Sequence, residues 1–480
     1  MSLDKSIPPE PEEDQAPFRP SQLWREVRTA LAGHPQDYTR SHIGRAILLL
    51  AVPMVLEMSM QSVFGVVDVF FVGRLGAAAV AVVGMTDSLL TLIFAVAMGL
   101  SMATTAMVAR RIGEKNPEAA SNVAVQSIGV GVSLSLITGL CGVVLAGDLL
   151  GLIGASRPIM EVGSRFTAIM LGGNITVMLL FLINAVFRGA GDAFIAMRAL
   201  WLANLINIVL DPLLIFGLGP FPELGLEGAA IATNIGRGVG VLYQLSRLRH
   251  GNGRIGVKLE GLRIDPFVIR RLLRISVVGM LQFLIGTASW LGVMRILAVF
   301  GGATLAGYTI AVRIIIFALL PSWGMGNAAA TLVGQNLGAG KPDRAERSVW
   351  ITGVSNMVFL GTIAVVFILF AQPLVRIFSS NAEVVAMGVD CLQIVSYSYV
   401  FMAFGMVTVQ AFNGAGDTTT PTWINLFCYW FLQIPMAYLL AIPLELGPRG
   451  VFAAIAVAQS ALALVSLFLF RRGGWKRRSV

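Results

Sequence analysis

Four carboxylates lie inside long apolar stretches of this sequence: Glu57, Asp68, Asp87 and Asp211. A charged side chain in the hydrocarbon core of a membrane costs a few kcal/mol or more, so each of them is a functional candidate. A buried carboxyl group can take up a proton, and carboxylate oxygens also bind hard cations such as sodium. The chemistry that these residues predict is the binding and release of an ion.

The spacing of the acids predicts that several of them lie together. Glu57 and Asp68 are eleven residues apart, which on a helix separates them by only about 20° and puts them on one face. Asn207 precedes Asp211 by four residues and shares its helical face. Thr233 lies early in the next apolar stretch, at a similar depth. We therefore expect Asp68, Asn207, Asp211 and Thr233 to form an ion-coupling cluster.

Each acid also has a structural interpretation. Asp211 could cap backbone groups freed by the proline that follows it. Asp68 could be an interfacial residue beside Arg74, and Glu57 could pair with an arginine inside a span, such as Arg295. The spacing gives no firm prediction for Asp87.

The composition requires a polytopic membrane protein. The 480 residues are 56% apolar and only 13% charged, with a mean hydropathy of +0.79, which is far from soluble globular usage. Long apolar stretches recur along the chain, each able to cross roughly 30 Å of hydrocarbon as a helix. The predicted spans are 46–70, 80–108, 121–146, 160–187, 195–218, 227–247, 272–299, 304–332, 348–371, 384–412, 421–442 and 449–470.

The basic residues indicate the orientation. Of the 35 Lys and Arg residues, 27 fall in connections on the side of the N-terminus or at the adjoining ends of spans, and 4 do so on the opposite side. The positive-inside rule then places both termini in the cytoplasm and explains the net charge of +9 without a nucleic-acid partner. Residues 1–44 form a cytoplasmic extension, predicted to be disordered over 1–20 and to contain an amphipathic helix around 23–31. Residues 471–480 form a basic cytoplasmic tail.

An internal repeat divides the chain into two halves. FRGAGD starting at Phe187 matches FNGAGD 225 residues later, and VARRIGEKNPEAA starting at Val108 matches VGQNLGAGKPDRA at the same offset. We predict two six-helix lobes, 45–248 and 272–470, joined by a basic cytoplasmic linker, 249–271. Because six is even, the lobes are parallel repeats about an axis along the membrane normal. Asp192 and Asp417, which end the two GAGD motifs, are predicted to be helix N-caps.

The repeat also tests the ion-site hypothesis. At the 225-residue offset, Asp68, Asn207 and Asp211 fall on apolar residues. Their counterparts are Val293, Leu432 and Met436. If the acids only satisfied the architecture, the second lobe should need them as well, so the asymmetry favours a dedicated ion site in the first lobe.

Motifs for enzymatic chemistry and for ATP binding do not occur in the sequence. The histidines lie outside the spans without metal-ligand spacing, and the cysteines are interpreted as packing residues. These residues are His34, His42 and His250, and Cys141, Cys391 and Cys428. There is no Gly-x-x-x-x-Gly-Lys-Ser/Thr phosphate-binding loop. The prediction is a protein without a cofactor or a resident metal that is not an enzyme and runs on an ion gradient.

Several motifs together resemble the multidrug and toxic compound extrusion (MATE) family. They are VVDVFFVGRLG at 66–76, the VARRIGEKNPEAA segment, RGAGD, NIVLDPLLIFG and LGLEGAAIAT, and the likeness runs from about residue 40 to 470. The resemblance implies an all-α membrane protein with 12 transmembrane helices, arranged as two six-helix bundles related by a pseudo-two-fold axis. It also implies antiport of organic cations or other amphiphiles against protons or sodium.

Within that family the sequence is similar to the DinF branch. That resemblance implies that Asp68, Asn207 and Asp211 line a cavity of the first lobe, with Thr233 and Gln61 beside them. It also implies that Pro53 is a bending proline. The acids that NorM-type members carry in the seventh and tenth helices correspond to Ser289 and Met402 in this sequence, which argues against a second cation site in the second lobe.

The function predicted from all these features is a secondary multidrug efflux antiporter that exports amphiphilic or cationic compounds in exchange for protons. Protonation of Asp68 and Asp211 would rearrange their bonds with Asn207 and Thr233, the first helix would bend at Pro53, and Gln61, Pro53 and Glu57 would serve the substrate cavity and its gating. Sodium at the same cluster remains an alternative, as does a flippase for a lipid-linked substrate. The expected setting is a monomer in the bacterial inner membrane.

Overall fold

The computed structural model describes residues 23–32, 36–251, 255–256 and 264–478. The predicted disorder of residues 1–20 lies outside this part of the chain. The first half is built from α1 (Leu23–Ala32), α2 (Ile43–Gly73), α3 (Ala77–Gly113), α4 (Pro117–Leu152), α5 (Arg157–Gly172), α6 (Asn174–Ala190), α7 (Ala193–Ile215) and α8 (Gly225–His250). The second half comprises α9 (Pro266–Leu297), η2 (Ala298–Phe300), α10 (Gly302–Gly338), α11 (Pro342–Arg376), α12 (Ala382–Ser396), α13 (Tyr399–Gly414), α14 (Thr419–Asn425), η3 (Leu426–Gln433), α15 (Ile434–Ala441), α16 (Gly447–Arg471) and η4 (Gly474–Arg477).

The membrane-spanning character predicted from the composition is confirmed. Among the described residues, ten helical segments are long and apolar enough to cross a membrane, and the pair α12 and α13, bent by 61°, makes an eleventh. The remaining predicted span, 227–247, corresponds to α8, which is not among them. This helix carries Asn234, Arg237 and Gln244, and their polarity lowers its hydropathy. The count of twelve therefore stays a prediction.

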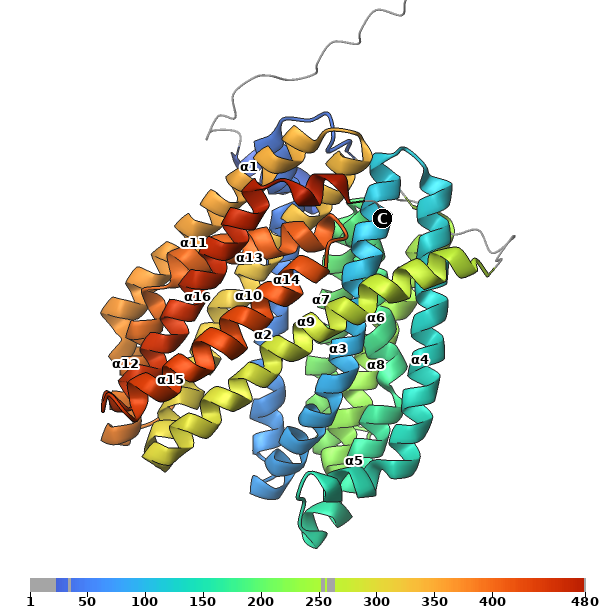
Figure 1. Ribbon diagram of the computed structural model, residues 1–480. Helices are drawn as coiled ribbons and strands as arrows, with labels where there is room; N and C mark the ends of the chain where they lie inside the picture. The colour runs from blue at the N-terminus through green and yellow to red at the C-terminus, as the bar shows by residue number, and fades with distance from the viewer. Residues whose placement is uncertain (1–22, 33–35, 252–254, 257–263, 479–480) are drawn as a thin grey trace, which may run out of the picture.

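The helices form two bundles (Figure 1), each with its own apolar core. Residues from α2 to α8 form the first core, which also includes Leu272 and Ile275 at the start of α9. The second core begins with Val293 near the end of α9 and continues to α16. Helix α9 thus crosses from one bundle to the other, as its diagonal course in Figure 1 shows.

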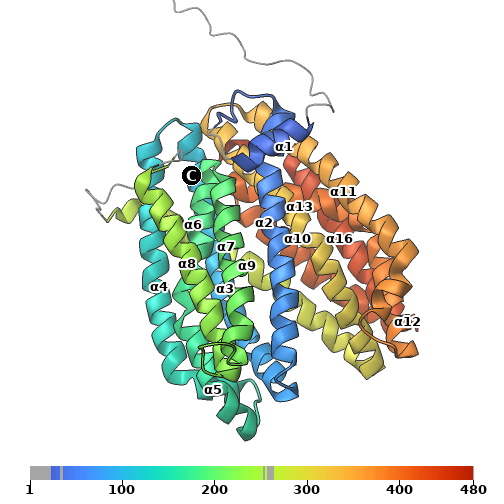
Figure 2. The same cartoon turned by 180° about the vertical axis from the view of Figure 1, so that it is seen from behind.

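Helix α2 makes the corresponding crossing in the first half of the chain. It packs against α10 of the second bundle and against α7 of the first, and Figure 2 shows it between the two bundles. Two glycines related by the repeat permit these crossings. A methyl group on Gly99 would overlap the backbone of α9 at Ser276, and one on Gly324 would overlap the backbone of α2 at Met54. Small residues at such contacts let helices approach closely.

The bundles touch where α3 meets α10, near the end of the molecule at which α1 and the C-terminal residues lie (Figures 1 and 2). We call this the terminal end. Gly113 and Gly338, another pair at the 225-residue offset, face each other's helices there. A methyl group on Gly113 would overlap the carbonyl oxygen of Gln335, and one on Gly338 would overlap that of Arg110. From this contact the bundles diverge toward the opposite end (Figure 1).

The repeated GAGD motifs make the same turn in both halves. Gly191 has a φ of 88° and Gly416 a φ of 82°, the left-handed region that glycine enters without steric cost. Asp417 then accepts the Thr420 amide at 3.3 Å and its hydroxyl at 2.7 Å, as an N-cap does. Asp192 occupies the N-cap position of α7 without a side-chain capping bond.

The segment between α1 and α2 bridges the bundles at the terminal end. The helix predicted around 23–31 is α1, and its Ala30 is buried against α2. The Tyr38 hydroxyl donates to the Gly191 carbonyl of the first bundle at 3.1 Å. Lys341 of the second bundle donates to the Thr39 carbonyl at 3.0 Å. This segment therefore contacts both bundles.

The C-terminal residues form a second bridge at the same end. Lys476 lies 2.6 Å from a carboxylate oxygen of Glu346, and this hydrogen bond raises the pKa of the lysine. Arg478 lies 3.4 Å from Asp417 in the second bundle, while its carbonyl accepts a hydrogen bond from Arg110 in the first. Both ends of the described chain thus hold the terminal end closed.

Candidate functional site

The predicted cluster of Asn207, Asp211 and Thr233 is assembled where α7 packs against α8. The Asn207 amide donates to a carboxylate oxygen of Asp211 at 3.2 Å and is 3.1 Å from the Thr233 hydroxyl. All three side chains are buried, and Asp211 is fully buried. The second Asp211 oxygen and the Asn207 carbonyl oxygen have no hydrogen-bond partner among the described residues. Two oxygens at this site are therefore free to hold a proton or a cation.

Asp68 joins this cluster through its charge. It interacts electrostatically with Asp211 across the space between α2 and α7. Asp87 on α3 and Arg237 on α8 belong to the same charged group, since Arg237 interacts with both Asp68 and Asp87. The cluster thus contains three acids and one arginine from four helices.

The structure gives no support to two alternative interpretations: Asp68 as an interfacial residue beside Arg74, and Asp211 as a cap for backbone groups freed by Pro212. Arg74 stacks over the Phe70 ring at 4.5 Å instead of pairing with Asp68. Helix α7 continues through Pro212 to Ile215, and the recorded partner of the Asp211 side chain is Asn207. Helix α2 is also continuous through Pro53, from Ile43 to Gly73.

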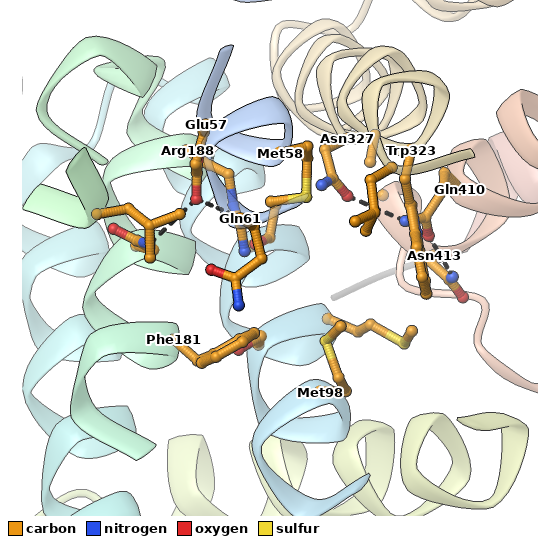
Figure 3. A pocket seen from close by; sticks show the side chains of 18 residues that line it. Glu57, Met58, Gln61, Met98, Phe181, Arg188, Trp323, Asn327, Gln410 and Asn413 are labelled. Carbon is orange, nitrogen blue, oxygen red and sulfur yellow. Dashed lines mark hydrogen bonds and ion pairs between the residues drawn. The ribbon is translucent and has the colours of Figure 1, made fainter. Parts of the chain in front are cut away.

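A second polar group lines a cavity of about 140 Å³ between the two bundles (Figure 3). The first bundle supplies Glu57, Gln61, Asn184 and Arg188, with Met58, Met98 and Phe181. The second bundle supplies Trp323, Asn327, Gln410 and Asn413 on the opposite wall. Hydrogen bonds between side-chain amides connect the residues of that wall. Gln410 donates to Asn327 at 3.0 Å, and Asn413 donates to Gln410 at 2.7 Å. The cavity is apolar and sulfur-rich between two polar walls.

Glu57 is paired, but with Arg188 and not with Arg295. Arg188 and Asn184 donate to the same Glu57 oxygen at 3.3 and 3.1 Å. Arg295 is exposed on α9. The predicted arginine partner of Glu57 exists, but Arg295 was the wrong residue. Arg188 was not considered because it lies one residue beyond the predicted span 160–187 and was assigned to a connection.

The second bundle has a smaller cavity, of about 40 Å³, within its own helices. Its polar lining consists of neutral groups: Trp290, Tyr308, Tyr429, Gln433 and Gln459. Tyr429 and Gln433 come from η3, a stretch of π-helix. The described residues contain no carboxylate or basic side chain in this lining.

Sequence reasoning missed Arg188 and gave no role in the cluster to Asp87 or Arg237. Arg237 follows Thr233 by four residues on α8, so helical spacing could have placed it on the face of the cluster. Arg188 directly precedes the first GAGD motif, where the repeat has Asn413. That difference of charge at matched positions is the signal that could have marked it.

The sequence matches the MatE family over residues 53–213 and 275–439, which is most of the chain. The chain belongs to the MATE family. A probable multidrug resistance protein NorM from Thermotoga maritima is 26% identical, with 91% of this chain and 94% of that protein aligned. A FAD transporter from Shewanella oneidensis is 25% identical, with 90% of this chain and 95% of that protein aligned.

A solved MATE family transporter of the MOP superfamily in an outward-facing conformation has the same fold. Its TM-score is 0.86 at 26% identity, covering 94% of this chain and 98% of that one. The MATE transporter predicted from the motifs is therefore confirmed as a multi-pass membrane protein, and its relatives include multidrug efflux proteins.

Proposed function

We propose that this MATE protein exports amphiphilic organic compounds in exchange for protons, and that Asp68, Asn207, Asp211 and Thr233 bind the coupling ion. The observation that supports this most is the fully buried Asp211, one of whose oxygens has no hydrogen-bond partner among the described residues. An isolated carboxylate is expensive in such a place, and a proton on that oxygen removes the charge. Gain and loss of a proton would therefore change the energy of this cluster more than that of any exposed acid.

The connection from the cluster to the movement of the bundles runs through α2. This helix carries Asp68 on its first-bundle side and packs at Met54 against Gly324 of α10. Pro53 lies directly before that contact and lacks the amide that would hold the helix straight. A change of charge at Asp68 can thus bend α2 at Pro53 and shift α10. Glu57 and Gln61, on the same helix, line the cavity and would respond to that bend.

The orientation follows from the basic residues, which favour a cytoplasmic terminal end in a bacterial inner membrane. With the bundles in contact at that end, the described state would face outward, in agreement with the outward-facing relative. Coupling requires that the two arrangements of the bundles differ in their affinity for the proton. The working unit would be a monomer.

Sodium is the second candidate ion, supported by the free carbonyl oxygen of Asn207 beside the free oxygen of Asp211. Oxygen ligands of this kind suit a hard cation. A flippase for a lipid-linked pyrophosphate has less support. Such a site needs a cavity rich in basic residues, whereas Arg237 interacts electrostatically with Asp68 and Asp87, and Arg295 and Arg313 are exposed.

The experiment is transport of a fluorescent organic cation in proteoliposomes, with either a proton or a sodium gradient imposed. We expect the proton gradient to drive accumulation, and Asp211→Asn to reduce it to background because the exchangeable charge is gone. Asp148→Asn, an exposed acid on α4, is the matched control and should transport normally. Movement that needs no gradient, or an unaffected Asp211→Asn variant, would overturn the proposal. Accumulation driven by sodium alone would replace the proton with sodium.

A further inference from the structure

The cavity between the bundles lies on the axis that relates the two halves. Its lining includes pairs of residues at the 225-residue offset: Met98 with Trp323, Met102 with Asn327, Thr105 with Ala330, and Arg188 with Asn413. Positions that correspond in the repeat therefore face each other across one space. Both bundles line the cavity, but both of its charges come from the first bundle.

These two charges are Glu57 and Arg188, so the lining as a whole is neutral. Glu57 is almost completely buried and Arg188 nearly so. The Glu57 oxygen that Arg188 contacts also accepts Asn184, whereas the other Glu57 oxygen is buried without a partner among the described residues. A buried carboxylate oxygen without a partner calls for a hydrogen-bond donor.

Arg188 also has unused capacity. A guanidinium has five N–H donors, and in the described part of the chain one bond, to Glu57, is recorded for it. The facing wall offers it no carboxylate, since Trp323, Asn327, Gln410 and Asn413 are all neutral. A bound molecule can therefore donate a hydrogen bond to Glu57 and accept one from Arg188 at the same time.

From this arrangement we propose that the Glu57–Arg188 pair binds a compact aromatic zwitterion, whose ammonium group bonds to the free Glu57 oxygen and whose adjacent carboxylate bonds to Arg188. The aromatic ring would lie against Trp323, Phe181 and the methionines, which favour ring contacts. This inference deepens the proposed function and rests on it for transport, since it names the class of molecule that the cavity selects.

Charge balance weakens the binding of simpler guests at this pair. A monocation bound at Glu57 leaves Arg188 uncompensated in a desolvated space, and a monoanion bound at Arg188 does the same to Glu57; both arrangements are costly. A zwitterion keeps the cavity neutral and turns one ion pair into a closed ring of four alternating charges. A cavity of about 140 Å³ also matches a guest with one ring, since engineered cavities of about 150 Å³ bind benzene.

Binding of the guest would affect the second bundle through hydrogen bonds to the backbone at Arg188 and Gly189. The Thr331 hydroxyl of α10 donates to the Arg188 carbonyl at 3.1 Å, and the Gln335 amide donates to the Gly189 carbonyl at 2.9 Å. A guest that pulls the Arg188 side chain toward the cavity acts on the residue that carries this contact between the bundles.

The test is equilibrium binding to the purified full-length protein, measured by calorimetry at about pH 6, where amines are protonated. Three ligands share the aromatic ring and differ in charge: phenylalanine is a zwitterion, its methyl ester a monocation and N-acetylphenylalanine a monoanion. Each derivative also carries a small methyl or acetyl group, so the reversal of the order in the variants separates charge from size. The wild-type protein should bind phenylalanine at least about tenfold more tightly than either derivative. Equal binding of the ester, or no binding of phenylalanine, would overturn the proposal.

Variants make the prediction sharper. Arg188→Gln should reverse the order in favour of the ester, and Glu57→Gln should reverse it in favour of the N-acetyl compound. The double variant keeps the cavity neutral, so it should fold even if a single variant does not, and it should lose the preference. Arg295→Gln, an exposed arginine on α9, should retain the wild-type order. An unchanged order in the folded double variant would contradict the proposal.

Because binding needs no gradient, these results are independent of ion coupling. Loss of proton-driven transport in the dye experiment would leave the binding order intact and would refute only the proposed antiport. A wrong binding order with intact transport would refute only the assignment of the zwitterion.

Discussion

The two bundles share their architecture but differ in their charges. The glycines that allow close helix contacts occur in both halves, as Gly99 and Gly324, and as Gly113 and Gly338. The charged cluster occurs only in the first. The 225-residue offset falls to 222 after the loop before α8, since ELGLEGAA at Glu223 matches ELGPRGVF at Glu445. At the repeat positions of the cluster the second bundle has Val293, Val312, Leu432, Met436, Ile455 and Gln459, and Val312, Ile455 and Gln459 line the small neutral cavity there.

This difference separates the residues that build the fold from those that act within it. Both bundles form an apolar core, one with three acids and an arginine and the other with apolar and amide side chains at the same places. The acids are therefore not required by the packing. A buried charge is costly, and its retention in one bundle points to a role that the other does not have.

The largest effect is expected where the charged cluster loses its one cation. Arg237→Met should lower the free energy of unfolding by up to about 3 kcal/mol, because Asp68 and Asp87 would both lose their partner. Gln459→Met, the same change at the repeat position, should cost less than about 1 kcal/mol. Chemical denaturation of both variants in detergent measures the two values. Equal losses of unfolding free energy would mean that the charged cluster and its apolar counterpart in the second bundle contribute equally to stability.

The glycine contact should show the opposite pattern, because it is symmetric. Gly113→Ala and Gly338→Ala both force a methyl group into the facing helix, and such overpacking costs about 1–3 kcal/mol. That is roughly a five- to 150-fold loss of the state closed at the terminal end. Spin labels at the exposed Glu118 and Arg347 would report the separation of the bundles by double electron–electron resonance.

Gly129→Ala supplies the control for this measurement, since a methyl group at Gly129 meets open space. It should leave the distance distribution unchanged. Unequal shifts from the two contact glycines would show that the bundles do not move as symmetric bodies.

The smallest effects are expected at the chain ends, each of which holds one copy of the GAGD motif. Tyr38→Phe removes the hydrogen bond to the Gly191 carbonyl. It should shift the equilibrium away from the state closed at the terminal end by about 1 kcal/mol, measured from the same distance distribution. Arg478→Gln removes the ion pair to Asp417 and should have a smaller effect, because the arginine is about half exposed. An effect of either variant that exceeds that of the glycines would make the chain ends, and not α3 and α10, the main closure.

The sequence predicted much of this molecule correctly. Most of the spans, the repeat and the shared face of Asn207 and Asp211 were predicted from local features: hydropathy, spacing and the 3.6-residue period. The repeat offset also identified which half has the acids. None of these features depends on how helices distant in the chain are placed.

Partners across the fold were beyond such reasoning. The hydrogen bond from Arg188 to Glu57 joins residues 131 positions apart, and the one-dimensional pattern made Arg295 an equally good partner. Arg237 on α8 interacts electrostatically with Asp68 on α2 and Asp87 on α3 only because these three helices are packed close together. Helix rotation and order around a bundle depend on packing against several neighbours at once.

The sequence by itself determined that the chain is a membrane protein, where it spans, and that it is built twice. These properties follow from composition and periodicity, which each segment carries alone. Only the tertiary structure decided that α2 and α9 cross between the bundles, that Glu57 pairs with Arg188 in a neutral cavity, and that Asp211 keeps one oxygen free. Those properties depend on which helix faces lie opposite each other, because a charge inside a membrane is defined by its neighbours.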